Sequence, residues 1–471
     1  MQLFNNFKKN KNKVALIIDN GRKFKFKDIL ELEKNFKKKI EKKQLILILA
    51  SNSIGSILFY ILSILNQNKI ILIDENLNNQ EISKIIDLYQ PNYIVSKIKK
   101  TNLKKKPKLI LKLFDCSIVR TNFDIHNLNK NLLLLLPTSG STGSSKFVKL
   151  SEKNIISNTK SILRYLKINS KDRAITNMPF YYSYMLSILN SHLFSGGSIY
   201  VSNKTILEKK FWIEFKRKKI TSFSGVPYTW EILNRIGKEK IFTKSLRYIT
   251  QAGGKLDITL ANRFYQLCKL KKKDMYIMYG QTEASPRIAY IKNENITKHK
   301  GSIGKPIYGV KMWIENQKSK KILKPNKIGE IFISGDNVMM GYSSSLKDLK
   351  NTNIINSKFK KLNTGDVGYF NKDGFFYITG RSNRIVKLYG NRVDLDEIES
   401  KMNNYNLNVV CTSKNDDLVI FFTKKILQKK IENKLYEIMK LNISRVRFVK
   451  IDKIPFTKNK KTNYKKLLEL C

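Results

Sequence analysis

Apolar runs of strand length alternate with amphipathic segments of helix length through most of the first 380 residues of the chain. Clear examples of these runs lie at residues 109–113, 132–136, 199–202 and 276–279. Strands that are buried on both faces carry such continuous apolar sequence, and their alternation with helices is typical of α/β folds. The pattern therefore predicts an α/β architecture.

One uncharged stretch runs from Gln44 to Asn68 and is long enough for a membrane span. A Ser-Asn-Ser sequence at 51–53 and a glycine at position 55 interrupt it with residues that are typical of turns. A strand at 45–50, a helix at 57–65 and a strand at 69–74 account for it better. We therefore expect a buried β-α-β unit of a soluble protein. Residues 17–22 (Ile-Ile-Asp-Asn-Gly-Arg) likewise predict a hairpin turn before a helix.

The pattern changes after residue 300. Short strands and many glycines between residues 301 and 376 predict a β-rich subdomain. Residues 380–384 (Gly-Arg-Ser-Asn-Arg) have the composition of a linker, and a small α+β tail follows them. A chain of 471 residues also exceeds what one core usually organises, so at least two domains are expected.

The composition indicates which broad class of protein this chain belongs to. Hydrophobic residues at 42% and aromatic residues at 11% indicate a packed globular chain. The cysteines at 116, 268, 411 and 471 lack paired spacing, which predicts free thiols in a reducing, cytoplasmic setting. The start of the chain has no apolar segment typical of a signal peptide. The net charge of +53 is spread along the whole length, whereas a nucleic-acid binder usually concentrates it on one face, so no nucleic-acid partner is expected.

The strongest local feature is the segment from Leu132 to Lys146, in which five leucines precede Pro-Thr-Ser-Gly-Ser-Thr-Gly-Ser-Ser-Lys. Glycines at 140 and 143 allow the main chain to approach a ligand closely. Hydroxyl donors and a lysine suit the binding of polyphosphate. The candidate phosphate-binding residues are Thr138, Ser139, Gly140, Ser141, Thr142, Gly143 and Lys146. An ordinary Ser/Gly turn after a strand is the alternative.

This loop resembles the Thr-Ser-Gly-Ser-Thr-Gly-x-Pro-Lys element of the adenylate-forming superfamily, with Ser145 in place of the proline. That superfamily includes acyl-CoA synthetases, adenylation domains of nonribosomal peptide synthetases, and luciferases. Further motifs similar to those of the family follow in order. They are Tyr279-Gly-Gln-Thr-Glu283, Gly329-Glu-Ile with Gly341-Tyr342, Thr364-Gly-Asp366, Gly380-Arg381 with Lys387, Gly390, Arg392 and Glu397-Ile-Glu399, and Pro455-Phe-Thr-Lys-Asn-Lys-Lys461. Together they span nearly the whole chain.

The resemblance implies a fold and its boundaries. A large N-terminal α/β domain with stacked sheets and a β-rich subdomain is expected over residues 1–380. A small mobile α+β domain is expected over residues 381–471. The boundary lies near Arg381, and Asn383 takes the place of the family's acidic hinge residue. Asparagine tolerates unusual dihedral angles, which suits a hinge.

The resemblance also implies chemistry in two steps. A carboxylate attacks the α-phosphate of ATP to give an acyl-adenylate and pyrophosphate, and a thiol then takes the acyl group. Glu283 would hold Mg²⁺, and Thr282 would contact the α-phosphate. Asp366 would accept hydrogen bonds from the ribose hydroxyls, with Arg381 beside it. The adenine would be bordered by Gly253, Gly254, Tyr279 and Gly280.

Lys461 stands where the family has the lysine that bridges the attacking and leaving oxygens. The tail departs from the family pattern at two positions, because Lys460 replaces a glycine and Tyr464 replaces an arginine. A solvated surface lysine is the plain alternative for Lys461. After a domain rotation, Gly390 and Arg392 would border the thiol channel.

The acyl pocket is expected around Tyr182, Gly225, Val226 and Gln251. Residues 178–186 resemble a family segment in which Tyr182 replaces a histidine and Met185 a glycine, although such an aromatic stripe is equally typical of core. No acidic residue lies between Met178 and Asn190, where amino-acid-activating members place an aspartate. This favours a small neutral acyl or hydroxy-acyl carboxylic acid over an α-amino acid.

The sequence therefore predicts an ATP- and Mg²⁺-dependent acid–thiol ligase that uses coenzyme A or a carrier-protein phosphopantetheine as acceptor. An acidic acyl carrier protein is a candidate partner because the chain is so basic. Two alternatives stay open. One is a carrier-protein ligase for D-alanine or another amino acid, and the other is a non-catalytic remnant that binds ATP or acyl groups.

Overall fold

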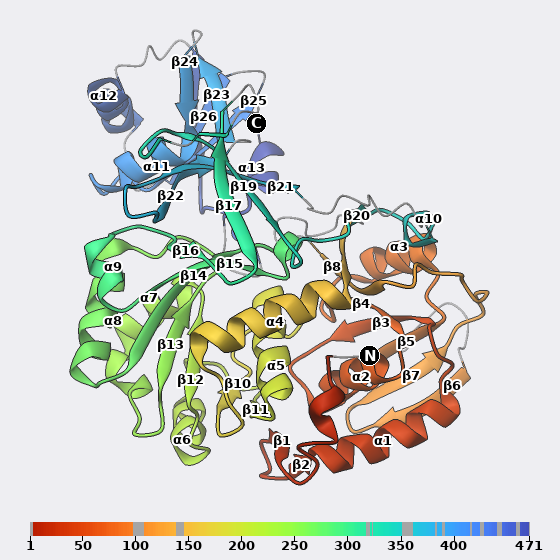
Figure 1. Cartoon of the computed structure of the whole chain (residues 1–471). Coiled ribbons are helices and arrows are strands. Elements are labelled where there is room, and N and C mark those ends of the chain that lie inside the picture. Colours follow the sequence, from red (N-terminus) through yellow and green to blue (C-terminus); the bar gives the residue numbers. More distant parts are fainter. Residues whose placement is uncertain are drawn as a thin grey trace. The chain divides into compact units, whose positions relative to one another are not determined.

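The computed structural model describes most of the chain in side-chain detail (Figure 1). The described residues are 3–97, 108–137, 146–316, 321–322, 324–350, 361–381, 384–388, 391–414, 417–423, 428–439, 445–457 and 462–470. They divide into two compact units. The first comprises Met1–Lys311 and Ser334–Lys361, and the second comprises Met312–Ile333 and Leu362–Cys471.

The largest sheet of the first unit contains eight strands among the described residues. In spatial order they are β20 (Tyr342–Ser343), β9 (Phe147–Ser151), β8 (Leu132–Pro137), β4 (Lys69–Asp74), β3 (Leu45–Ala50), β5 (Tyr93–Lys97), β7 (Cys116–Arg120) and β6 (Lys108–Leu113). Strands β3, β4, β5 and β8 run parallel, whereas the flanking strands run antiparallel. The order confirms the predicted strands at 45–50, 69–74, 109–113 and 132–136.

Two further sheets complete the first unit. One contains β10 (Arg173–Ile175), β11 (Ser198–Val201), β1 (Val14–Ile18) and β2 (Lys23–Lys25). The other contains β12 (Ser222–Gly225), β13 (Tyr248–Gln251), β14 (Asp274–Gly280), β15 (Arg287–Lys292) and β16 (Lys305–Pro306). Strands β1 and β2 form the predicted hairpin. The runs expected at 199–202 and 276–279 lie in β11 and β14, with boundaries shifted by a few residues.

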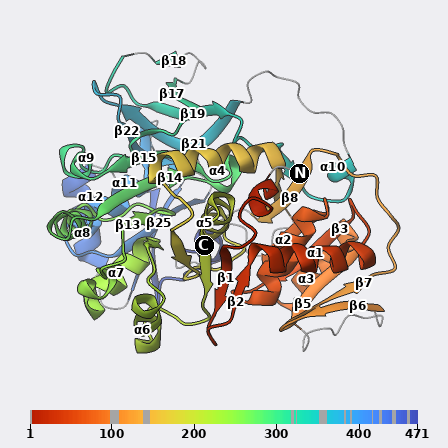
Figure 2. The same cartoon turned by 60° about the horizontal axis from the view of Figure 1, so that its bottom comes forward.

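The helices of the first unit lie between and around these sheets. They are η1 (Asn5–Phe7), α1 (Phe26–Lys39), α2 (Ile54–Leu65), α3 (Asn79–Tyr89), α4 (Glu152–Leu166), α5 (Ser183–Ser195), α6 (Lys209–Arg217), α7 (Pro227–Ile236), η3 (Lys238–Ile241), α8 (Ile258–Leu270), η4 (Thr282–Ala284), α9 (Glu294–Lys298) and α10 (Lys347–Lys350). Both views place α4 and α5 between the eight-stranded sheet and the β12–β16 sheet (Figures 1 and 2).

The uncharged stretch forms the β-α-β unit that its turn residues predicted. Strand β3 ends at Ala50, and Ser53 caps α2 by accepting a hydrogen bond from the Ser56 amide. Ile46 and Ile48 of β3 join one apolar cluster, while Leu45 and Leu47 join another on the opposite face. Burial on both faces explains the continuous apolar sequence. No helix in the described part of the chain is both long and apolar enough to cross a membrane.

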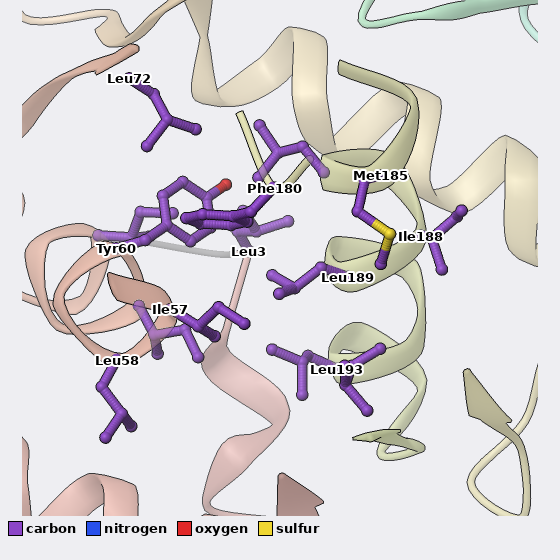
Figure 3. Packing of buried hydrophobic residues seen from close by; sticks show 14 of the residues in the cluster. Leu3, Ile57, Leu58, Tyr60, Leu72, Phe180, Met185, Ile188, Leu189 and Leu193 are labelled. Carbon is purple, nitrogen blue, oxygen red and sulfur yellow. The ribbon is translucent and has the colours of Figure 1, made fainter. Parts of the chain in front are cut away.

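The first core cluster joins segments far apart in the sequence (Figure 3). Leu189 and Leu193 of α5 point toward the side on which Phe180 and α2 lie, and Met185 and Ile188 belong to the same cluster. The Tyr60 hydroxyl of α2 donates a hydrogen bond to Asn190 of α5 at 3.1 Å. Because α5 follows the segment predicted to line the acyl pocket, this packing determines where that segment lies.

His192 on α5 makes the stability of this core depend on pH. Its Nδ1 atom lies 2.9 Å from the Ile188 carbonyl oxygen, and its Nε2 atom lies 3.4 Å from the Ser222 hydroxyl. Burial lowers the pKa of His192 below the usual 6.5, so the folded state favours the neutral ring. The free energy of unfolding should therefore be fully retained above about pH 6.5 and should fall as the pH decreases further.

Urea titrations between about pH 7.5 and pH 5.5 test this expectation. The His192 contribution has a slope of at most about 1.4 kcal/mol per pH unit, and His192→Gln should remove it. His126, whose Nε2 lies 2.8 Å from the Gln90 carbonyl oxygen, provides the matched control as His126→Gln. Equal pH slopes for wild type and His192→Gln would contradict the assignment.

The second unit contains three sheets among the described residues. The largest has β18 (Lys321–Ile322), β17 (Val310–Glu315), β19 (Gly329–Gly335), β21 (Lys361–Phe370) and β22 (Phe376–Arg381), which confirms the predicted β-rich region. The others are β23 (Ile385–Leu388) with β24 (Asn391–Asp394), and β25 (Val409–Lys414), β26 (Asp417–Thr423) and β27 (Val446–Ile451). The helices are α11 (Leu395–Asn403), α12 (Gln428–Met439) and α13 (Tyr464–Leu468).

One detail of the predicted linker is wrong. Gly380 and Arg381 are the last residues of β22, where they pair with Val367 and Asp366 of β21. The glycine suggested a turn, but the ladder with β21 continues through it because strand pairing provides backbone hydrogen bonds. The domain boundary near Arg381 itself stays a prediction.

Candidate functional site

Most of the predicted site residues of the first unit lie at one edge of the β12–β16 sheet. Strands β12, β13 and β14 are parallel, and their register aligns Gly225 with Gln251 and Gln251 with Ile277. Residues that follow the carboxyl ends of parallel strands meet at the same edge. Val226, the 252–254 segment and the 281–283 segment therefore gather here. This edge is where α/β sheets usually bind ligands.

The turn after β14 depends on a glycine. Gly280 pairs with Arg287 of β15, and a Cβ atom built on Gly280 would lie 2.0 Å from the Pro286 carbonyl oxygen. The amide of Gln281 donates a hydrogen bond to that same oxygen at 2.9 Å. The backbone of the two strands thus approaches too closely for any side chain at this position. The short helix η4, with Thr282 and Glu283, follows directly.

Replacement of Gly280 by alanine is therefore expected to lower the free energy of unfolding by about 1–3 kcal/mol and to weaken ATP binding, because Thr282 and Glu283 would shift. Gly309→Ala is the control for ATP binding: its φ of +81° strains a side chain and so also lowers stability, but no atom lies within 4 Å of a Cβ built there. Thermal melts and ATP titrations of both variants check the expectation. If ATP bound equally well to the two, the role assigned to this turn would be wrong.

Glu283, Tyr342 and Lys146 form a connected group. The Tyr342 hydroxyl donates a hydrogen bond to Glu283 Oε1 at 3.1 Å, and Lys146 Nζ lies 3.9 Å from the centroid of the Tyr342 ring. Strand β20 pairs with β9, with Tyr342 opposite Val148, and this pairing holds the tyrosine next to the end of the glycine-rich loop. Burial, and then the charge of Glu283, raises the pKa of Tyr342 to about 12, so the hydroxyl remains a donor at neutral pH.

The Glu283 carboxylate fits a magnesium ion that is shared with a nucleotide. Within the described residues its side chain accepts a hydrogen bond at Oε1 alone, and no three His, Cys, Asp or Glu residues gather to hold a metal. Mg²⁺ is commonly held by one or two carboxylates together with substrate phosphates and water, so a closed protein cage is not required. A single carboxylate that is linked through Tyr342 to a lysine meets that demand.

Tyr182 and Gly253 bring the predicted acyl-pocket and ATP residues together. Tyr182 precedes α5, and its hydroxyl oxygen would lie 2.4 Å from a Cβ atom built on Gly253. Gly253 also has a φ of +85°, which favours glycine. The Gln251 amide nitrogen donates to the Gly254 carbonyl oxygen at 2.8 Å and so shapes this segment.

A second contact joins the start of α5 to η4. The hydroxyl oxygens of Ser183 and Thr282 lie 3.2 Å apart and are both buried. Thr282, predicted to contact the α-phosphate, therefore contacts the residue that directly follows Tyr182 in the chain. The two predicted subsites are therefore adjacent.

The remaining predicted residues of this unit lie at the same edge. Val226 is close to Gly253, because its Cγ1 would be 3.2 Å from a Cβ atom built on the glycine. The Gly225 carbonyl oxygen accepts a hydrogen bond from the Trp230 indole at 3.2 Å. Tyr279 pairs with Ala289 in β14 and β15 and is half-buried. Phe180 and Met185, in contrast, belong to the core, so only part of the 178–186 segment can contact a substrate.

In the second unit, Asp366 and Arg381 form a pair across β21 and β22. Arg381 Nε donates to Asp366 Oδ1 at 3.1 Å, and Asp366 is 5% exposed. The Thr-Gly-Asp motif builds this position: the Thr364 hydroxyl accepts from the Asp366 amide at 3.2 Å and donates to the Ile331 carbonyl oxygen at 2.8 Å. The φ of Gly365 is +74°. A fixed carboxylate with an adjacent guanidinium suits the recognition of hydroxyl groups.

The departure at Tyr464 has a structural explanation. Its hydroxyl donates to Glu399 Oε2 at 3.1 Å, and Arg384 donates to Glu399 Oε1 at 2.6 Å. The Arg384 guanidinium also lies 4.0 Å from the centroid of the Tyr464 ring. The last glutamate of the Glu-Ile-Glu motif therefore helps to hold α13 against α11 within this unit.

Several predicted residues lie outside the described residues. They are Thr138, Ser139, Gly140, Ser141, Thr142, Gly143, Asn383, Gly390 and Lys461. The backbone of Arg392 belongs to β24, but its side chain is likewise outside the description.

Sequence reasoning missed two residues of this site. Tyr342 belonged to a Gly-Tyr motif whose side chain was given no role, and only the β9–β20 pairing brings it to Glu283. Arg287 begins the apolar strand β15, and its guanidinium carbon lies 3.9 Å from the centroid of the Tyr184 ring. The sequence signal that could have identified Arg287 is a charged residue at the start of an apolar strand, four residues after Glu283.

Comparisons with known proteins agree with this architecture. The family model described as AMP-binding enzyme matches residues 3–343. The oxalate–CoA ligase of Saccharomyces cerevisiae is 28% identical over 275 residues, which is 58% of this chain and 49% of the relative. The 2-succinylbenzoate–CoA ligase of Oceanobacillus iheyensis is 27% identical over 287 residues, 61% of this chain and 56% of the relative. The chain thus matches about half the length of these curated relatives.

Solved structures share the fold over the whole chain. The O-succinylbenzoate coenzyme A synthetase of Bacillus subtilis, in complex with ATP and magnesium, has a TM-score of 0.78 at 19% identity and covers 99% of each chain. ATP-bound MatB of Rhodopseudomonas palustris has a TM-score of 0.81 at 18% identity and covers 100% of this chain and 98% of its own. These similarities confirm the predicted α/β fold class.

Proposed function

Because the chain belongs to the AMP-binding enzyme family, we propose that it activates a carboxylic acid with ATP and then transfers the acyl group to a thiol. In the first step a carboxylate oxygen bonds to the α-phosphorus, the bond from that phosphorus to the bridging oxygen breaks, and pyrophosphate leaves. In the second step the thiolate sulfur bonds to the acyl carbon, and AMP leaves with the electron pair of the carbon–oxygen bond.

The observation that carries this proposal is the link from Glu283 through Tyr342 to Lys146. One tyrosine side chain contacts two charged groups of opposite sign, and Glu283 follows the carboxyl end of β14, which runs parallel to β13. Adenylation concentrates negative charge at the phosphates, and such preorganised groups stabilise it. Mg²⁺ held by Glu283 would neutralise part of the phosphate charge.

The other residues of the first unit take roles that follow from their positions. Lys146, with the 138–143 loop before it, binds the β- and γ-phosphates, while Thr282 contacts the α-phosphate. Glycines at 253, 254 and 280 allow a flat adenine ring to approach the backbone, and Tyr279 borders it. In the second unit Asp366 binds the ribose hydroxyls, and Arg381 orients its carboxylate through the 3.1 Å hydrogen bond.

The roles assigned to the chain after residue 380 rest on the sequence motifs. Lys461 stabilises the charge on the attacking and leaving oxygens. Asn383 is the hinge of a mobile domain over residues 381–471, and rotation about it brings Gly390 and Arg392 to the thiol channel. Such motions can set the rate of turnover.

Coenzyme A is the acceptor that we propose. Similar proteins include ligases that join oxalate and 2-succinylbenzoate to coenzyme A. The acid enters a pocket bordered by Tyr182, Gly225, Val226 and Gln251. A carrier-protein phosphopantetheine remains the alternative acceptor, since an acidic carrier protein would be attracted to a chain of net charge +53.

Pyrophosphate release from ATP and Mg²⁺, measured over a panel of carboxylic acids, tests the proposal. We expect one class of acid to stimulate release, and AMP to form together with an acyl-CoA when coenzyme A is added. If ATP binds but no acid stimulates release, a non-catalytic ATP-binding protein becomes the better account. Repeating the assay with phosphopantetheinylated carrier protein distinguishes the two acceptors.

A further inference from the structure

Arg287 carries a buried charge for which the described residues provide no counterion. The residue is 3% exposed, and its Nε atom is buried without a hydrogen-bond partner. Within the described residues no carboxylate forms an ion pair with its guanidinium. Its backbone is held by Asn158, whose amide nitrogen donates to the Arg287 carbonyl oxygen at 2.8 Å. The backbone contacts therefore fix the position of the charge, but no described side chain neutralises it.

Neutral aromatic rings surround the guanidinium. Its carbon lies 3.9 Å from the Tyr184 ring centroid, a cation–π contact that offsets part of the desolvation cost. Burial raises the pKa values of Tyr165, Tyr182 and Tyr184, and the charge of Arg287 opposes that rise in each case. All three phenols stay protonated at neutral pH, so none neutralises the arginine. An unpaired buried charge is costly, and a ligand anion would remove that cost.

The guanidinium lies on the acyl side of the candidate site. Tyr184, on which it rests, donates from its hydroxyl to the Thr250 carbonyl oxygen at 3.0 Å, one residue before Gln251. Tyr182, two residues earlier, is next to Gly253. Tyr182 and Gln251 belong to the predicted acyl pocket, whereas Tyr184 is a buried core residue beside them. The same β14–β15 turn carries a second buried donor without a partner, the side-chain nitrogen Nε2 of Gln281.

We propose that Arg287 binds a second carboxylate of the substrate acid, so that the acid activated by this protein is a dicarboxylate. The inference rests on the proposed function. One carboxylate would react near Thr282 while the other would pair with the guanidinium in the two-donor geometry that suits arginine. A cation at this place also disfavours an α-amino acid, because its ammonium group would be repelled.

Calorimetric binding of matched acids to the full chain tests the proposal without requiring turnover. The pairs are malonate and propionate, succinate and butyrate, and phthalate and benzoate, each measured with ATP and Mg²⁺ absent and then present. We expect at least one dicarboxylate to bind about 10- to 100-fold more tightly than its partner, the range of a charge-assisted hydrogen-bonded pair. Arg287→Gln should abolish that preference, and Arg287→Lys should keep part of it.

Arg164 provides the matched control, since its guanidinium also lies over a tyrosine, 4.1 Å from the Tyr308 ring centroid. Arg164→Gln should preserve the preference for the dicarboxylate. Circular dichroism and thermal melts establish that each variant is folded. If Arg287→Gln does not fold, the ratio of monocarboxylate to dicarboxylate dissociation constants in the wild type, together with the same ratio in Arg287→Lys, still tests the proposal.

Two results would overturn the inference. One is equal binding of the acids within every pair, or no binding of any dicarboxylate, in the wild-type chain. The other is a preference that Arg287→Gln retains. Failure of the proposed function is a separate outcome, because a dicarboxylate would then bind selectively without stimulating pyrophosphate release.

Discussion

Replacing Glu283 by glutamine is expected to reduce acid-dependent pyrophosphate release by about 100- to 1,000-fold, the range seen when one preorganised group that stabilises transition-state charge is lost. Glutamine keeps the shape of the side chain and can still accept the hydrogen bond from Tyr342, which is 3.1 Å long. It lacks the negative charge that would hold Mg²⁺ at the phosphates. The loss should therefore be electrostatic and should not disturb the fold.

The measurement is the initial rate of pyrophosphate release as a function of Mg²⁺ concentration. Glu283→Gln should require more Mg²⁺ for half-maximal rate, whereas Glu294→Gln, an exposed carboxylate in α9, should behave as wild type. Tyr342→Phe should lower the rate by only about 3- to 10-fold, since it removes one hydrogen bond to a charged group. A rate for Glu283→Gln within threefold of wild type would exclude the proposed role.

Replacing Lys461 by alanine is expected to slow acyl-adenylate formation by about 100- to 1,000-fold, because a positive point charge would be lost where charge builds on the attacking and leaving oxygens. Transfer of the acyl group from a supplied acyl-adenylate to coenzyme A should be slowed much less, since the α-phosphorus is not attacked and no pyrophosphate leaves in that step. The two half-reactions are measured separately, by pyrophosphate release and by acyl-CoA formation.

Lys453 gives a matched control for this lysine-rich tail, because it is exposed and lies eight residues earlier. Lys453→Ala should keep both rates. If Lys461→Ala slowed the two half-reactions equally, a general effect on the fold or on domain motion would explain the result better than a role in adenylation. If it slowed neither, the lysine would be one of the solvated surface charges.

The fold could be predicted because its signal is local. Five leucines at 132–136 and the apolar runs at 45–50 and 69–74 form parallel strands that are buried on both faces. Nearly every position of such a strand is therefore apolar, and the run is visible in the sequence itself. Ser53 likewise indicates the start of α2, because serine is a common N-cap residue and its side chain here accepts the capping hydrogen bond. The prediction of a linker was wrong at Gly380 and Arg381, because glycine is compatible with both a turn and a strand. Only the pairing with β21 decides between the two.

The site could be predicted where close backbone approach or charge requires a particular residue. Position 280 must be glycine because the Pro286 carbonyl oxygen leaves no room for a Cβ atom, and Glu283 follows it in the same motif. Asp366 is likewise positioned by its own motif, through the hydrogen bond from its amide to the Thr364 hydroxyl. The sequence by itself therefore determined the fold class, the family resemblance and most of the candidate residues. Each of these depends on the identity of a residue and on its neighbours along the chain.

Only the tertiary structure decided which of these residues meet and what surrounds them. Tyr342 reaches Glu283 because β20 pairs with β9, more than 190 residues earlier in the chain. Arg287 is significant because α4, α5 and β14 bury it among neutral phenols, without a carboxylate from the described residues. Burial and the absence of a counterion are properties of contacts between distant segments, so no local pattern in the sequence could record them.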